Sequence, residues 1–188
     1  MRSEPQRDRI SFDPHDQPSF GLVYLAFAYV AVLFMPRPWT ALAATLAATA
    51  VFLPVYFTFH RHSGNDCLPW ILATAAIGYG LSAFSTGANT FVIYAMTMAA
   101  TALRPRAAIV WGAVFAVLYG PLQWLSLPLW RVVVPLSLFT LLLGAILIAS
   151  ILLSRARARD LAALRLSQDE VRRLATLAER ERIGRDLH

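Results

Sequence analysis

The residue with the clearest chemical potential is His188, which ends the run Glu179-Arg180-Glu181-Arg182-Ile183-Gly184-Arg185-Asp186-Leu187-His188. Imidazole is the side chain whose neutral form is populated near pH 7, so one of its ring nitrogens can act as a nucleophile. Phosphoryl transfer to such a nitrogen depends on in-line positioning more than on covalent activation by the protein. On a helix, Ile183 and Leu187 share one face, and His188 points away from it. The spacing therefore predicts an apolar face toward a partner helix and an accessible histidine.

The same run resembles the phosphoacceptor box of two-component sensor histidine kinases, in the DesK-like subfamily of thermosensors and nitrate sensors. That box has the form E-R-x-R-I-(A/G)-R-(E/D)-L-H-D, and residues 179–188 match it at every position they contain. In the family, the acid after the histidine helps to accept its proton, and this acid is not in the sequence. The apolar region before the box is similar to these kinases in layout rather than in residues.

The resemblance implies an ATP-dependent protein-histidine kinase that passes its phosphoryl group to an aspartate of a response regulator. It implies that His188 is the phosphoacceptor. The box residues that precede it are Glu179, Arg180, Arg182, Ile183, Arg185, Asp186 and Leu187. The sequence contains no Gly-rich nucleotide loop and no Asn-rich box. We therefore expect this chain to be the sensor portion of a longer kinase and to be inactive alone. ATP and Mg²⁺ are expected in a separate catalytic domain, with no cofactor or metal bound by this chain.

A second group of candidate ligands lies in one loop, which contains His60, His62, Asp66 and Cys67. All four are metal-ligand types, but the spacing H-x-H-x3-D-C matches no standard zinc pattern. We interpret the segment as a polar cytoplasmic loop and predict no metal site. Because Cys67 is the single cysteine, an internal disulfide framework is excluded.

The composition predicts that these residues are positioned by a membrane protein. Of the 188 residues, 57% are hydrophobic and 15% are charged, and the mean hydropathy is +0.54. Soluble domains contain roughly 45–50% apolar and about 25% charged residues. The composition therefore excludes a disordered chain, a disulfide scaffold and an ordinary soluble enzyme. The net charge of +6 is typical of a cytoplasmic membrane face, and we expect no nucleic-acid partner.

The pattern of apolar runs predicts an all-α fold, a polytopic membrane helix bundle that continues into a cytoplasmic helix. We expect a solvated tail over residues 1–19 and a sensor bundle over 20–153. The six expected spans cover residues 20–35, 39–59, 68–84, 89–103, 107–127 and 132–153. A membrane helix needs about 20 apolar residues, so the first, third and fourth runs are short. Five spans remain the alternative, if the first or the fourth run is re-entrant.

The separation of the third and fourth spans follows from length. Residues 67–103 carry no charge, and as one helix they would be about 55 Å long, against a hydrocarbon core of roughly 30 Å. The stretch Ser85–Asn89 is the turn-forming part of this segment. Asn89 at its end is expected to cap the following helix, or else to bond between helices.

The arginines predict the orientation. With six spans, one side of the membrane holds Arg2, Arg7, Arg9, Arg61, Arg104, Arg106, Arg155, Arg157 and Arg159, and the other holds Arg37 and Arg131. By the positive-inside rule both termini are cytoplasmic. Together with the resemblance, this predicts a multi-pass protein of the bacterial inner or plasma membrane.

Residues 154–178 are expected to form a coiled-coil signalling linker, followed by the start of the dimerisation and phosphotransfer domain at 179–188. Leu161, Leu164 and Val171 share one heptad register, and Leu174 and Leu177 fall in another. We predict a parallel homodimer with a register shift between them. The alternative is a charged helix that lies on the membrane surface.

The signal is expected to arise in the bilayer, because every loop between the spans is short. Short helices are strained when a bilayer thickens on cooling, which favours sensing of temperature, fluidity or thickness. A small membrane-active ligand is the competing stimulus, in a pocket lined by Tyr79, Tyr94 and Tyr119.

A non-catalytic membrane scaffold remains an alternative function for the chain. A transporter is disfavoured because no polar or ionisable side chain is evident at mid-membrane.

Overall fold

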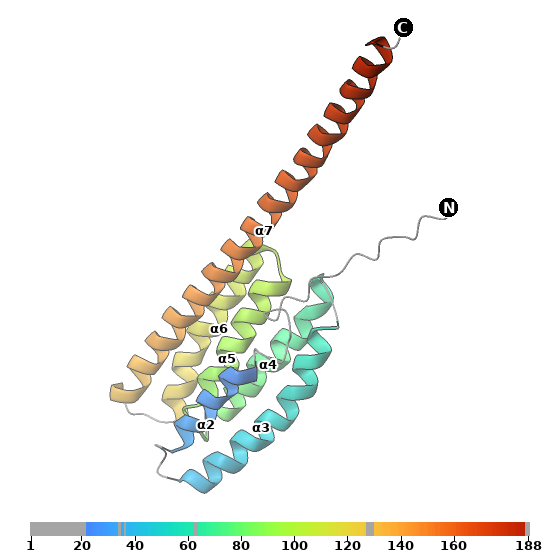
Figure 1. The fold of residues 1–188 in the computed structure, drawn as a ribbon. Coiled ribbons are helices and arrows are strands. Elements are labelled where there is room, and N and C mark those ends of the chain that lie inside the picture. Colours follow the sequence, from blue (N-terminus) through green and yellow to red (C-terminus); the bar gives the residue numbers. More distant parts are fainter. Residues whose placement is uncertain (1–21, 34, 36, 62–63, 127–129, 187–188) are drawn as a thin grey trace.

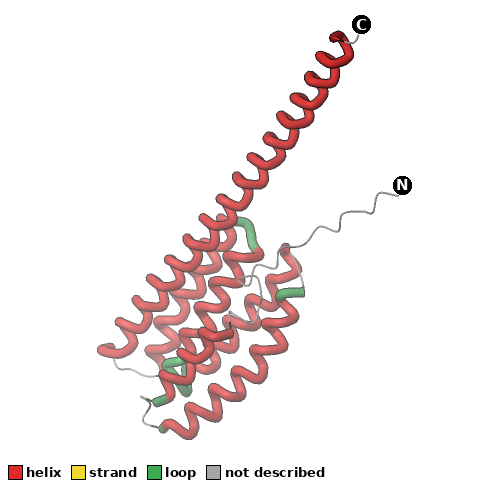
Figure 2. The backbone as a smooth tube through the Cα atoms, in the orientation of Figure 1, coloured by secondary structure: helices red, strands yellow, loops and turns green. Residues whose placement is uncertain are grey.

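The computed structural model describes residues 22–33, 35, 37–61, 64–126 and 130–186. At residues 64–65, 126, 130 and 179–186 the description covers the backbone alone. Within these ranges the chain is helical and contains no strand, which confirms the expected all-α class (Figure 2). The α-helices are α2 (Ala26–Val32), α3 (Pro38–Phe59), α4 (Leu68–Leu81), α5 (Ala88–Ala102), α6 (Pro105–Ser126) and α7 (Trp130–Asp186). Two 3₁₀ turns, η2 (Leu22–Leu25) and η3 (Gly64–Cys67), precede α2 and α4. The expected tail over residues 1–19 lies outside the described ranges.

Helix α5 is the centre of the bundle (Figure 1). It packs against α4, α6 and α7, whereas α3 packs on α4 and α2 lies on α3 and α5. Small residues make this central position possible, because Ala95, Ala99 and Ala100 are fully buried and let neighbouring backbones approach. The break between α4 and α5 falls at residues 82–87, which overlaps the expected turn Ser85–Asn89 but begins three residues earlier.

Glycines on neighbouring helices allow the closest contacts. A Cβ on Gly112 of α6 would overlap the Ile148 side chain of α7, and one on Gly78 of α4 would lie 2.9 Å from the Val92 Cγ2 atom of α5. Gly78 and Gly112 thus both serve packing between helices of the same chain. The Gly112 contact brings α6 and α7 close together at Ile148.

Three helices are long and apolar enough to cross a membrane, namely Pro38–Phe59, Pro105–Leu125 and the long helix from Arg131. Helices α4 and α5 have 14 and 15 residues and are therefore only about 21–22 Å long. The described helix at the first expected span is shorter still, since it covers Leu22–Val32. Each of the six expected spans thus corresponds to a helix, but the first and third helices are shorter than expected, since α4 ends at Leu81 rather than at residue 84.

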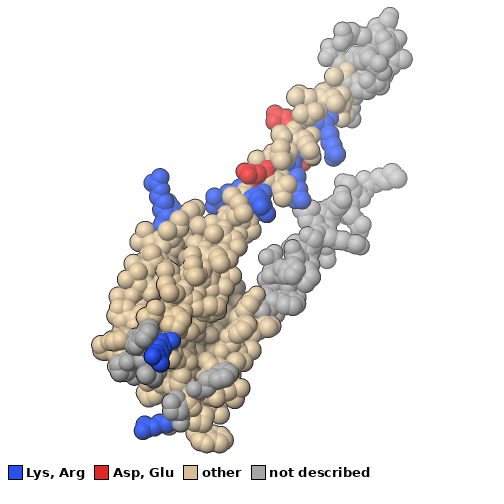
Figure 3. Space-filling model, turned by 90° about the vertical axis from the view of Figure 1, so that its left-hand side faces the viewer, with Lys and Arg blue, Asp and Glu red and all other residues tan. Residues whose placement is uncertain are grey.

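The arginines separate to the two ends of the bundle. Helices α3 and α7 begin beside Arg37 and Arg131 at one end, and α3 ends at the opposite end, where α6 begins after Arg104 (Figure 1). On the face drawn in Figure 3, charged side chains lie at the bundle ends and along the projecting helix, and the belt between them is uncharged. This uncharged belt is the surface expected of a membrane-embedded bundle.

Helix α7 is the longest element and leaves the bundle as a projecting rod (Figure 1). Its 57 residues give a length of about 85 Å. The expected linker, residues 154–178, is helical throughout. Its apolar side chains are exposed in the single chain, with Leu161, Leu164, Val171, Leu174 and Leu177 between 56% and 65% exposed.

Candidate functional site

The box of the sequence prediction lies at the far end of α7. The helix continues as far as Asp186, so the backbone of residues 179–186 is helical. Leu187 and His188 lie outside the described residues. For the other box residues, Glu179, Arg180, Arg182, Ile183, Arg185 and Asp186, the description covers the backbone alone. The phosphoacceptor role of His188 therefore stays a prediction.

The point where α7 leaves the bundle is marked by Arg155. Its Nη1 atom donates hydrogen bonds to the carbonyl oxygens of Ala100 at 2.6 Å and Leu103 at 2.9 Å. Arg155 is half-buried, whereas Arg157 and Arg159 are exposed. One guanidinium thus joins α7 to the end of α5.

The end of α5 is a natural acceptor for this arginine. Arg104 precedes Pro105, and the residue before a proline is disfavoured in the helical region, so α5 ends at Ala102. The last carbonyls of a helix have no following N–H donors in the helix, and they carry the negative end of its dipole. The Arg155 guanidinium supplies both the missing hydrogen-bond donors and a positive charge at this helix end. Arg155 is 55 residues from Ala100 and 52 residues from Leu103 in sequence. The sequence therefore predicted the side of the membrane on which Arg155 lies, but not its contact with α5.

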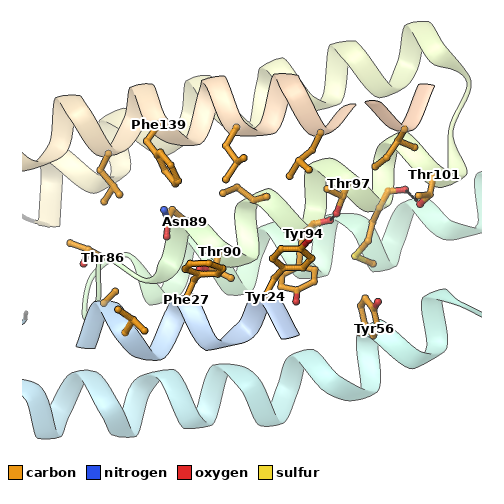
Figure 4. Close-up of a pocket in the computed structure, with 18 of the residues that line it drawn as sticks. Tyr24, Phe27, Tyr56, Thr86, Asn89, Thr90, Tyr94, Thr97, Thr101 and Phe139 are labelled. Carbon is orange, nitrogen blue, oxygen red and sulfur yellow. Dashed lines mark hydrogen bonds between the residues drawn. The ribbon is translucent and has the colours of Figure 1, made fainter. Parts of the chain in front are cut away.

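A groove of about 710 Å³ runs along α5 between α7 on one side and α2 and the end of α3 on the other. Figure 4 shows Tyr24 of η2 and Phe27 of α2 on one side of the groove and Phe139 of α7 on the other, with Tyr94 and Thr97 of α5 along its floor. Of the three tyrosines expected to line a ligand pocket, only Tyr94 lines this groove. The Tyr79 hydroxyl instead donates to the Phe115 carbonyl oxygen at 3.1 Å, and Tyr119 is buried elsewhere in the core.

Asn89 lines the same groove, and the expectation that its side chain caps α5 is wrong. The helix N-cap is Gly87, and no side chain bonds to the free N–H groups of the first turn as a cap. The Ser85 hydroxyl oxygen instead accepts from the Gly87 N–H at 3.1 Å, which stabilises the preceding turn. The Asn89 side chain is half-buried and directed into the groove (Figure 4).

Gln123 is a buried polar residue that the sequence reasoning passed over. Its side chain is fully buried in α6, and neither amide atom has a hydrogen-bond partner among the described residues. Three buried threonines differ, because the hydroxyls of Thr45, Thr74 and Thr140 bond to carbonyls of their own helices. The hydroxyls of Tyr119 and Ser137 are without a partner among the described residues, as the Gln123 amide is. The Gln123 amide is therefore a cost to stability.

Replacing Gln123 with the similarly shaped methionine is expected to raise the free energy of unfolding by about 1–3 kcal/mol, because an unsatisfied buried amide is removed. Chemical unfolding of the chain in detergent micelles measures this difference. Gln168→Met on the exposed part of α7 is the matched control and should change nothing. A loss of stability in Gln123→Met would mean that the amide is bonded after all.

The loop with metal-ligand residue types is not assembled as a ligand cluster in the described residues. The His60 Nδ1 atom lies 2.9 Å from the Tyr56 carbonyl oxygen of its own helix, Asp66 is exposed and Cys67 is buried. Burial raises the pKa of the Cys67 thiol, and the adjacent Asp66 carboxylate raises it further. The thiol is thus held in its neutral, unreactive form. His62 lies outside the described residues.

Comparisons of the chain with protein-family models, curated proteins and solved structures find no match.

Proposed function

We propose that this chain is the membrane sensor part of a two-component histidine kinase that phosphorylates itself on His188. The observation that supports the proposal most directly is the unbroken helix α7, which runs from the apolar bundle to the box residues. A single helix carries a rotation or a shift over its length without an intervening joint. A change in the bundle would thus reach the phosphoacceptor.

The proposed arrangement has six membrane crossings with both termini cytoplasmic, in a bacterial inner or plasma membrane. Helices α4 and α5 are short, yet α5 lies beside α7 from the level of Leu136 and Phe139 to that of Arg155. This supports a full crossing by α5 rather than a re-entrant loop. The short first helix, Leu22–Val32, keeps five crossings as the alternative.

The proposed stimulus is the thickness or fluidity of the bilayer, which changes with temperature. Helix α5, at about 22 Å, is shorter than an average hydrocarbon core of about 30 Å, and mismatch costs fractions of a kcal/mol per Å. Arg155 ties the end of this short helix to α7. A thicker bilayer that displaces α5 would therefore pull on α7 where it enters the cytoplasm.

The proposed assembly is a parallel homodimer through the cytoplasmic part of α7. Leu161, Leu164 and Val171 leave an exposed apolar stripe that a single chain does not cover, and pairing of two such stripes buries it. The same surface would place two copies of His188 side by side for a catalytic domain and a response regulator.

Leu164→Arg is expected to weaken dimerisation by about tenfold or more, because a charge would enter the apolar seam. Leu166→Arg is the matched control, since Leu166 is exposed and lies on the opposite face of the heptad that contains Leu161 and Leu164. Sedimentation of the chain in detergent measures the monomer–dimer equilibrium. Equal effects of the two changes would contradict a seam at Leu164.

The kinase proposal is tested with the parent kinase in lipid vesicles, supplied with ATP and Mg²⁺. We expect acid-labile phosphate on the wild type and none on His188→Ala, with an amount that depends on lipid chain length and temperature. Phosphate that needs His188 but ignores the bilayer would keep the kinase and exclude the proposed stimulus. No acid-labile phosphate despite bound nucleotide would overturn the kinase and favour a non-catalytic membrane scaffold.

A further inference from the structure

The groove along α5 has the chemistry of a site for a hydrocarbon chain. Its volume of about 710 Å³ lies within the range of roughly 300–1,000 Å³ typical of ligand sites. Its sides carry aliphatic residues such as Val30 and Leu147, and Ile93 lies on its floor. The hydroxyls of Thr97 and Thr101 are already bonded to the Tyr94 and Met98 carbonyls at 2.9 Å. At Thr97 and Thr101 the floor therefore offers methyl groups rather than free donors.

The position of the groove determines what can fill it. It lies between the helices at the level of the uncharged belt, and its side walls include Tyr24, Phe27 and Phe139, which are 62%, 65% and 52% exposed. Such exposure of large apolar side chains shows that the groove is open to the surroundings of the bundle. In a bilayer those surroundings are acyl chains, and an empty groove would lose their dispersion contacts.

The groove follows most of α5 and has a polar end at Asn89. From Asn89 to Thr101 the floor follows α5 for 12 residues, which is about 18 Å, so an extended acyl chain that starts at Asn89 can lie along it. Asn89 lies at the start of α5, near the proposed non-cytoplasmic surface, and its amide points into the groove. An amide at this depth is placed to donate to an ester carbonyl.

We propose that the groove binds one acyl chain of a lipid from the non-cytoplasmic leaflet, with its ester group at Asn89 and its chain along α5 toward Thr101. Because α7 forms one wall, the bound chain contacts the same helix that leaves the bundle. The site needs only the embedding of the bundle in a membrane. Failure of the kinase test therefore leaves it unaffected, and its own failure leaves the kinase proposal unaffected.

The test uses the whole chain in phosphatidylcholine vesicles that contain a phosphatidylcholine with a diazirine in its acyl chain. After irradiation, the labelled positions are mapped by mass spectrometry of peptides. Helix α5 is the informative element, because most of its side chains are buried in the protein and the groove exposes the remainder, including Ile93 and Thr97. We expect label on these two residues.

Ala31→Phe is the variant that fills the groove, since Ala31 lines its wall. It should reduce labelling of α5 by about tenfold and leave the label on the outer face of α3 unchanged. Ala47→Phe, on the exposed face of α3, is the matched control and should leave α5 labelling as in the wild type. The proposal is overturned if the wild type carries no label on α5. It is also overturned if Ala31→Phe and Ala47→Phe change α5 labelling equally, or if a second copy of the chain is cross-linked there instead.

Discussion

Arg155→Ala is expected to lower the free energy of unfolding of the bundle by about 1.5–3 kcal/mol, the range for hydrogen bonds to a charged group. The change removes both bonds to the Ala100 and Leu103 carbonyl oxygens and leaves the end of α5 without a donor. Chemical unfolding in detergent micelles, followed by circular dichroism, measures the difference. In the proposed kinase, the same change should also weaken the response of His188 phosphorylation to lipid chain length.

Arg157→Ala is the matched control for this prediction. It removes the same charge two residues along the same helix, but Arg157 is exposed, so stability should change by less than about 0.5 kcal/mol. Arg155→Lys keeps the charge while losing the planar fork, and we expect a partial recovery. Equal effects of Arg155→Ala and Arg157→Ala would show that net charge at the membrane surface, rather than the contact with α5, is what matters.

Ala158→Pro is expected to abolish the coupling between the bundle and the box while the bundle remains folded. Ala158 is exposed and lies in the part of α7 just outside the bundle. A proline there removes a backbone hydrogen bond and clashes with the preceding turn, at a cost of about 3 kcal/mol or more. In the proposed kinase in vesicles, the amount of phosphate on His188 should then no longer follow lipid chain length.

Ala158→Gly is the control, because it weakens the helix by only about 1 kcal/mol without breaking it. It should retain most of the bilayer response. The unfolding of the bundle, measured in detergent, should be unchanged in both variants, which separates loss of coupling from loss of folding. A proline variant that still responds to the bilayer would show that the signal does not travel along a continuous α7.

The helical class was predictable from the sequence because the evidence for it is local. Apolar runs without charges require helices in a bilayer, where every backbone N–H and C=O group must find a partner within its own segment. The break between α4 and α5 was predictable for the same reason, since a charge-free helix over residues 67–103 would be longer than a bilayer is thick. The charges of α7 likewise mark where the apolar stretch ends, near Arg155.

The contacts within the bundle were not predictable, because they join residues far apart in the chain. Asn89 reads as a helix cap by its position, yet the turn is stabilised by Ser85, and the Asn89 amide is free to face the groove. Arg155 reads as one of several cytoplasmic charges until α5 is placed beside α7.

The sequence by itself thus determined the helices, their approximate ends and the apolar character of the belt, since these depend on composition and on short-range spacing. The tertiary structure alone decided which helix lies at the centre, which carbonyls receive Arg155 and where the groove opens. The physical reason is that helix packing depends on the fit of side chains on several faces at once. Small residues such as Gly78 and Gly112 permit a close approach, but they do not specify the partner.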